Sequence, residues 1–69
     1  AVVAPLPGVV VSVSVENGAT LAAGDEVCVI EAMKMKNVIR AARGGVVASV
    51  KVSNGQHVKH SDVLIEFAD

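Results

Sequence analysis

The chain has 69 residues, which is room for one domain, and we expect a single domain over residues 1–69 without an elaborate cleft of its own. Its net charge of −1, with no basic run and almost no aromatic residues, excludes the usual nucleic-acid-binding surfaces, and no apolar stretch is long enough to cross a bilayer. The single cysteine, Cys28, excludes an internal disulfide and suits a reducing compartment. Sixteen valines against one aromatic residue, Phe67, predict sheet rather than helix, because β-branched side chains fit a pleated surface.

The same pattern occurs twice along the chain, 37 positions apart. Gly8 falls on Gly45, the pair Asn17-Gly18 falls on Asn54-Gly55, and no gap is needed between residues 8 and 30. Because neither half could bury its apolar face alone, the repeat predicts one domain with internal pseudo-two-fold symmetry.

The predicted elements are short strands divided by turns. The first strand alternates over residues 9–15, and this period of two places Val9, Val11, Val13 and Val15 on one face. An Asn-Gly turn follows it, as it follows the equivalent strand of the second half, since both residues tolerate positive φ. Further strands are predicted, in chain order, at residues 27–30, 38–41, 46–52 and 63–65. We therefore expect about eight short strands and no helix of consequence, folded as two facing antiparallel sheets or a flattened barrel around a valine-rich core.

The two halves meet in a short segment, residues 31–39, where the pattern predicts a hairpin with its tip near Met33 and Lys34. This tip lacks the Gly, Asn or Asp that normally forms such a turn, and it leaves at least one of Met33 and Met35 exposed. Local rules of this kind are broken mainly at functional sites, so the tip is the candidate site of the chain.

The run Glu31-Ala32-Met33-Lys34-Met35 resembles the attachment signature of biotinyl domains, which are the carrier domains of biotin-dependent carboxylases, decarboxylases and transcarboxylases. The opening run Ala4-Pro5-Leu6-Pro7-Gly8 is similar to the start of that family, and the spacing of the Asn-Gly and Gly-Asp turns also matches. The resemblance implies an all-β fold, a flattened eight-strand barrel-sandwich of two four-stranded antiparallel sheets with pseudo-two-fold symmetry. The lysine would lie at a hairpin tip at one end and both termini at the other.

The same resemblance implies that a biotin protein ligase, using ATP, joins biotin covalently to the ε-amine of Lys34. Glu31, Ala32, Met33 and Met35 would form the flanking recognition surface, in which the small Ala32 leaves the amine open and the methionines offer flexible apolar contact. The carrier would be monomeric and non-catalytic. It would move a carboxyl group between the biotin carboxylase or decarboxylase site and the carboxyltransferase site of a larger enzyme, such as an acyl-CoA or pyruvate carboxylase. The expected location is the cytoplasm, or the mitochondrial matrix in a eukaryote.

Each of these residues also has an ordinary structural interpretation. Lys34 could be a solvated turn lysine, Glu31 a strand-end charge, and Met33 and Met35 core-filling side chains. Lys36 falls two residues late for the motif, and we interpret it as a solvated strand residue.

The remaining reactive side chains have little support as a site. Cys28 has no His or basic residue near it in the sequence, so we interpret it as a small buried hydrophobe rather than a nucleophile. His57 and His60 fall in a turn and a short strand, and with one cysteine their spacing does not build a zinc site.

Two other classes of protein stay open. A lipoyl carrier domain has a similar fold but typically carries Asp-Lys-Ala at the tip, where this chain has Met33-Lys34-Met35. An unmodified barrel-sandwich adaptor module usually lacks that tip. An enzyme in its own right has the least support, because the chain has no paired carboxylates, nucleophile–base pair or phosphate-binding loop. Within the biotinyl family, the gap-free match over residues 8–30 leaves no place for the protruding thumb of bacterial acetyl-CoA carboxylase carriers.

Overall fold

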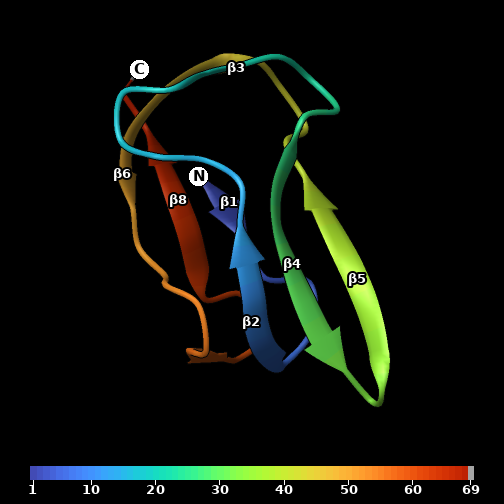
Figure 1. Ribbon diagram of the computed structural model, residues 1–69. Helices are drawn as coiled ribbons and strands as arrows, with labels where there is room; N and C mark the ends of the chain where they lie inside the picture. The colour runs from blue at the N-terminus through green and yellow to red at the C-terminus, as the bar shows by residue number, and fades with distance from the viewer. Residues whose placement is uncertain (69) are drawn as a thin grey trace.

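A computed structural model describes residues 1–68, and over these residues the chain forms strands and no helix. One four-stranded sheet has the order β1-β8-β6-β3 and the other has the order β5-β4-β2-β7, with antiparallel pairing throughout (Figure 1). The strands are β1 (Val2–Val3), β2 (Gly8–Val13), β3 (Thr20–Leu21), β4 (Glu26–Ala32), β5 (Met35–Arg40), β6 (Gly45–Val50), β7 (His57–Val58) and β8 (Val63–Phe67). The all-β prediction with two four-stranded sheets is confirmed. Within the described part of the chain, no helix has the length and apolar character needed to cross a membrane.

The repeat in the sequence is also a repeat in the hydrogen-bond register. The bounds of β2 and β6, and those of β3 and β7, differ by the same 37 positions. The pairing of Val10 with Ile30 recurs as that of Val47 with Phe67. The turns repeat as well, because a carboxylate oxygen of Asp25 accepts a backbone hydrogen bond at 2.9 Å and one of Asp62 accepts its counterpart at 2.8 Å. The pseudo-two-fold symmetry is therefore present in the backbone and in its turn chemistry.

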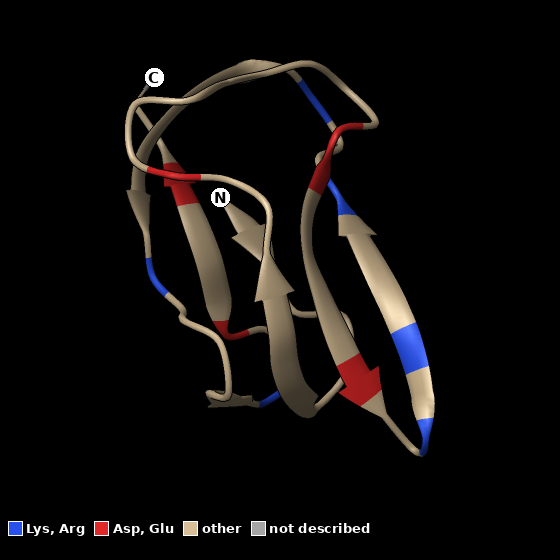
Figure 2. Cartoon of the chain, viewed as in Figure 1, with Lys and Arg blue, Asp and Glu red and all other residues tan. Residues whose placement is uncertain are grey.

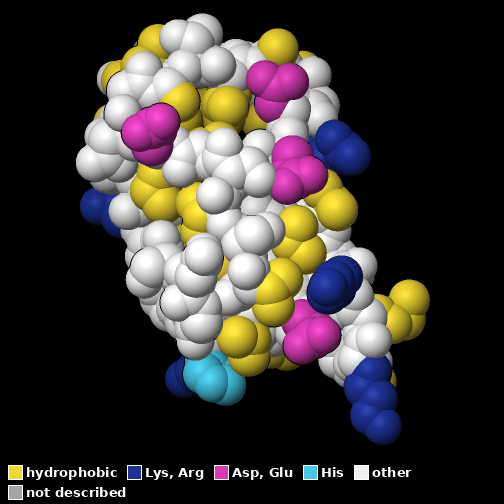
Figure 3. All heavy atoms as spheres, in the orientation of Figure 1, with side chains coloured by type: hydrophobic (Ala, Val, Ile, Leu, Met, Phe, Trp, Pro, Cys, Tyr) yellow, Lys and Arg dark blue, Asp and Glu magenta, His cyan; other side chains and the backbone are white. Residues whose placement is uncertain are grey.

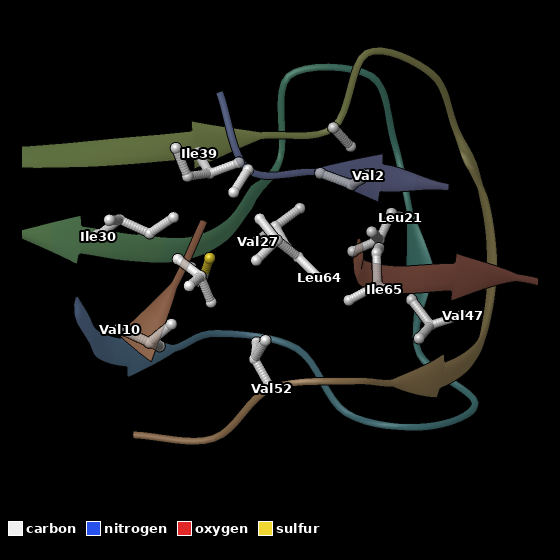
Figure 4. Packing of buried hydrophobic residues seen from close by; sticks show 14 residues of the cluster. Val2, Val10, Leu21, Val27, Ile30, Ile39, Val47, Val52, Leu64 and Ile65 are labelled. Atoms are coloured by element: carbon white, nitrogen blue, oxygen red, sulfur yellow. The ribbon is translucent and has the colours of Figure 1, made fainter. Parts of the chain in front are cut away.

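The core lies between the two sheets and contains only apolar side chains. Ile30, Leu64 and Ile65 are its largest fully buried members, and the described residues include no buried polar or charged side chain (Figure 4). The full set of buried hydrophobic residues is Val2, Ala4, Val10, Leu21, Val27, Cys28, Ile30, Ile39, Ala41, Val47, Val52, Val58, Leu64 and Ile65. Both halves of the repeat contribute to this cluster, which explains why neither half would be stable alone.

The predicted alternation along the first strand is wrong in one respect. The register of β2 against β4 shifts between Val10 and Ser12, and the register of β6 against β8 shifts at the equivalent place. A bulge of this kind adds one residue to a strand and changes the face to which the following side chains point. Val13 and Val15 consequently pack against the core while Val11, before the shift, is 37% exposed, although the sequence pattern placed Val9, Val11, Val13 and Val15 on a single face.

The molecule is elongated, with principal dimensions of 33 × 19 × 18 Å. The β4–β5 hairpin projects from one end, and the N-terminus and the end of β8 lie toward the other (Figure 1). This arrangement leaves the turn between β4 and β5 clear of the rest of the chain.

Candidate functional site

The candidate site is the two-residue turn that joins β4 to β5. Ala32 pairs with Met35 as the last rung of the ladder, so Met33 and Lys34 are the two central residues of the turn. Their φ angles are 52° and 66°, which is the left-handed pair that a type I′ hairpin turn requires. Side chains other than glycine avoid this region at a cost of about 1 kcal/mol or more each. The tip therefore has an unfavourable local conformation, held in place by the ladder on either side.

The side chains at the tip extend into solvent. Met33 is 95% exposed, Met35 is 68% exposed, and Lys34 is exposed as well. Lys34 forms the basic apex of the hairpin (Figure 2), and among residues 1–68 no hydrogen bond or ion pair to its side chain is found. The interpretation of Met33 and Met35 as core-filling side chains is therefore wrong, because the core ends below them.

The rung below the tip carries charge on its outer face. Glu31 pairs in register with Lys36, and both side chains are exposed. Lys36 thus lies on strand β5 rather than in the turn, which confirms its interpretation as a solvated strand residue. Ala32, between Glu31 and the turn, is half-buried and leaves the approach to Lys34 unobstructed.

Two further residues support the hairpin, and the sequence analysis did not single out their roles. Gly8, in β2, faces the last residues of β4, and a Cβ built on it would lie 2.5 Å from the Glu31 carbonyl oxygen and 2.6 Å from Ile30 Cγ2. Only a glycine allows β2 to pass this close to the base of the hairpin. The half-buried Asn37 donates its side-chain amide in two long hydrogen bonds. One, at 3.4 Å, goes to the carbonyl oxygen of Ile30 and links β5 to β4, and the other, at 3.3 Å, goes to that of Met35 within β5. In the sequence, the signal for the role of Asn37 was its place as a polar residue two positions before Ile39, which the structure buries.

The other reactive side chains lie away from the tip or are unreactive. Cys28 is fully buried, and burial first, then the charge of Glu26, raises the pKa of its thiol, which agrees with its interpretation as a buried hydrophobe. His57 lies in β7 and His60 in the following turn, both exposed. Within the described residues, no group of three or more His, Cys, Asp or Glu side chains could hold a metal ion.

Two surface grooves of the domain lie away from the tip. One groove of about 580 Å³ lies between the ends of the two long repeat strands, and its lining includes the symmetric pairs Val13 with Val50 and Asn17 with Asn54. Another of about 370 Å³ lies between β1 and β5. Neither is lined by any of residues 31–36. An exposed primary amine on a projecting turn, away from both of these grooves, suits a group that is presented to other active sites and fits covalent attachment of a cofactor through that amine.

Comparison with known proteins identifies the family. The family model described as "Biotin-requiring enzyme" matches residues 1–67. The chain belongs to the family of biotin-requiring enzymes. It is a biotin carboxyl carrier domain, and biotin is its cofactor.

Relatives of the carrier domain are parts of larger proteins. It is 52% identical over 62 residues to the mitochondrial propionyl-CoA carboxylase alpha chain of Homo sapiens, a match that covers 90% of this chain and 8% of that protein. It is 42% identical over 65 residues to the biotin carboxyl carrier protein of Streptococcus mutans, covering 94% of this chain and 50% of that one. The carrier domain thus spans less than a tenth of the carboxylase alpha chain and half of the separate carrier protein.

Solved structures support the same fold. A single-chain, multi-domain long-chain acyl-CoA carboxylase matches with a TM-score of 0.86 and 42% identity, over 94% of this chain and 6% of that chain. The lipoyl domain of the 2-oxoglutarate dehydrogenase complex from Azotobacter vinelandii matches with a TM-score of 0.77 at 21% identity, over 91% of this chain and 80% of that one. At 21% identity, the match to the lipoyl domain shows a shared barrel-sandwich fold and nothing beyond the fold.

Proposed function

We propose that Lys34 is the residue to which biotin is attached. The observation that carries the proposal is the position of Lys34, exposed at the apex of a projecting hairpin with no side-chain partner among residues 1–68. An amine in this place can enter the pocket of a biotin protein ligase without any rearrangement of the core. The ligase uses ATP to activate the biotin carboxyl group, and the amide bond forms at Lys34 Nζ. One positive charge is lost, so the net charge changes from −1 to −2.

The neighbours of Lys34 would present it rather than react. Met33 and Met35 offer exposed, flexible, apolar surface on either side, which can fit several partner pockets in turn. The small Ala32 leaves the approach to Lys34 open, and Glu31 supplies a charge one rung below the tip. Biotin held on Lys34 would supply a ureido nitrogen that can carry a carboxyl group from one active site to another. The hairpin would hold the tether at the end of the molecule opposite the connection to the rest of the protein.

We further propose that the carrier domain is part of an acyl-CoA carboxylase of the propionyl-CoA carboxylase type. The 52% identity to the human alpha chain supports this assignment. In such a protein the partners would be the biotin carboxylase and carboxyltransferase active sites, and catalysis would belong to them. Tethering would raise the effective concentration of biotin at both sites. The location would be the mitochondrial matrix in a eukaryote, as the name of the human relative indicates for that protein, and the cytoplasm in a bacterium.

The test is co-expression of the 69-residue chain with a biotin protein ligase, followed by intact-mass measurement and avidin binding. We expect one biotin per chain, lost in Lys34→Ala and retained in Lys36→Ala, which is the matched control two residues away on β5. Biotin on any other lysine would refute the assignment. Parallel incubation with a lipoate ligase tests the lipoyl alternative, for which we expect no mass increase. Size-exclusion chromatography of the same samples is expected to give a monomer, in line with one independent domain over residues 1–69.

A further inference from the structure

A patch of valine side chains covers the outer face of the lysine-bearing sheet. Val29 on β4 pairs in register with Val38 on β5. On the neighbouring strand β2, Val9 pairs with Glu31, and Val11 lies in the bulge just before Ser12, the partner of Val29. Val38 is 45% exposed and Val11 is 37% exposed, while Val9 and Val29 are half-buried. These four residues are called the valine patch below. Figure 3 shows hydrophobic side chains over β2 and β4, with a basic and an acidic side chain beside them.

The internal repeat shows that the fold does not require a valine at the centre of this patch, position 29. The core positions stay apolar in both halves, since Val10 corresponds to Val47 and both are buried. On the outer faces the two sheets are alike at one position, because Val9 corresponds to the exposed Val46, and they differ at another. Val29, opposite Ser12, corresponds to Glu66, opposite Ser49, and the register is the same in both. A sheet of this geometry therefore tolerates a carboxylate at the centre of its outer face, and the valine at position 29 has another cause.

Charged rungs frame the valine patch at both ends. Glu31 and Lys36 pair in register at the rung nearest the tip, which Val9 shares, and Glu26 and Arg40 pair in register at the far end. An apolar centre with a polar rim is the usual composition of a protein–protein interface. A stable interface buries about 800 Å² on each partner, which would be about a fifth of the 4048 Å² surface of this chain, so four partly exposed valines suit a transient partner better than a second copy of the chain.

We propose that the valine patch is the surface on which the biotin protein ligase docks, an inference that rests on the assignment of Lys34 as the acceptor. The chemistry of the two kinds of partner selects the ligase. The carboxylase active sites act on biotin at the end of a long tether, and they can reach it without holding the sheet. In the ligase reaction Lys34 Nζ is itself the nucleophile, so the enzyme must approach the hairpin closely and grip the protein beside it. The valine patch begins one rung below the tip, because Val9 pairs with Glu31.

The test exchanges residues between the two sheets. Val29→Glu gives the lysine-bearing sheet the glutamate that the other sheet has at the equivalent position, 66. Glu66→Val makes the reverse exchange and is the control. We expect Val29→Glu to lower the ligase kcat/KM by at least tenfold, mainly through a higher KM, and Glu66→Val to leave it within twofold. Thermal unfolding of each variant shows that the comparison is made between folded proteins. Val38→Thr, which keeps a β-branched side chain, repeats the measurement if Val29→Glu fails to fold.

Each outcome separates this inference from the proposed function. Wild-type ligation kinetics in Val29→Glu and in Val38→Thr would overturn the docking proposal while leaving Lys34 as the acceptor. The docking proposal would also be overturned if the variants changed only carboxyl transfer in the full carboxylase, because the patch would then bind a carboxylase partner. A change of oligomeric state on size-exclusion chromatography would overturn it as well, because the patch would then bind a second copy of the chain. Biotinylation that survives Lys34→Ala would instead overturn the proposed function.

Discussion

Gly8 lies so close to Glu31 that a Cβ on Gly8 would stand 2.5 Å from the Glu31 carbonyl oxygen. The contact joins the start of β2 to the end of β4, one rung below the turn that carries Lys34. The equivalent glycine of the second half, Gly45, would place its Cβ 2.9 Å from a ring carbon of Phe67. One glycine therefore faces rigid backbone at the base of the hairpin, and the other faces a side chain at the opposite end of the sheet pair.

Gly8→Ala is expected to destabilise the domain by about 1–3 kcal/mol and to lower the rate of biotinylation, because the new methyl group must push the end of β4 aside. The measurement is urea unfolding together with ligase kinetics at a temperature where the variant is fully folded. Gly45→Ala is the control for position, since its new methyl group meets the Phe67 ring away from the hairpin, and the folded variant should ligate at the wild-type rate. Normal ligation by folded Gly8→Ala would mean that the close contact serves packing alone.

Met33→Asn is expected to stabilise the domain by about 0.5–1 kcal/mol, because asparagine adopts the left-handed conformation of the first turn position with less strain than methionine. The denaturation midpoint should rise with an unchanged slope. Met35→Asn, in the strand, should give no such gain because its φ is not positive. Equal or lower stability of Met33→Asn would show that the methionine at 33 contributes contacts that outweigh its backbone strain.

Ser61→Gly is expected to stabilise the domain by a similar amount, about 0.5–1 kcal/mol, which corresponds to a rise in Tm of several degrees for a domain of this size. Ser61 has φ 73° at the place where the first half has Gly24 with φ 92°, so the repeat itself shows the preferred residue. The reciprocal variant Gly24→Ser should lower the Tm. Scanning calorimetry on both variants checks the pair, and a fall in Tm for Ser61→Gly would contradict the strain argument.

The stability of the domain is expected to fall at alkaline pH because of Cys28. Burial raises the pKa of its thiol above the usual value of 9.0, so the thiol stays neutral in the folded chain over a range in which it ionises in the unfolded chain. The contribution of the neutral thiol to the free energy of unfolding is fully present below the pKa of the unfolded chain. It is lost as the pH rises from that value through the pKa of the folded chain. Urea unfolding of the wild type and Cys28→Ala between pH 7 and pH 10 measures this loss. If the stabilities of the two proteins decline in parallel over that range, the thiol is not the cause.

The sequence predicted which residues form the candidate site, but it did not predict which residues hold the hairpin in place. The signature around Lys34 and the missing turn residues marked the tip, because both are local features of consecutive residues. The role of Gly8 was not predictable in the same way, since it depends on how closely β2 approaches β4 in space. The exposure of both Met33 and Met35 also required the structure, because a period of two allows either face of a strand to be the buried one until its register is known.

By itself, the sequence determined the number of strands, their turns and their two-fold repetition. These follow from short-range physics, since β-branched residues favour strands and Asn-Gly pairs favour turns wherever they occur. The tertiary structure decided which valines form the core. The bulge after Val10 turns Val13 toward the core, and its counterpart in β6 does the same for Val50. The side on which a strand residue lies depends on pairing with a segment distant in sequence, so the difference between Val29 on one outer face and Glu66 on the other became visible only once the two sheets were assembled.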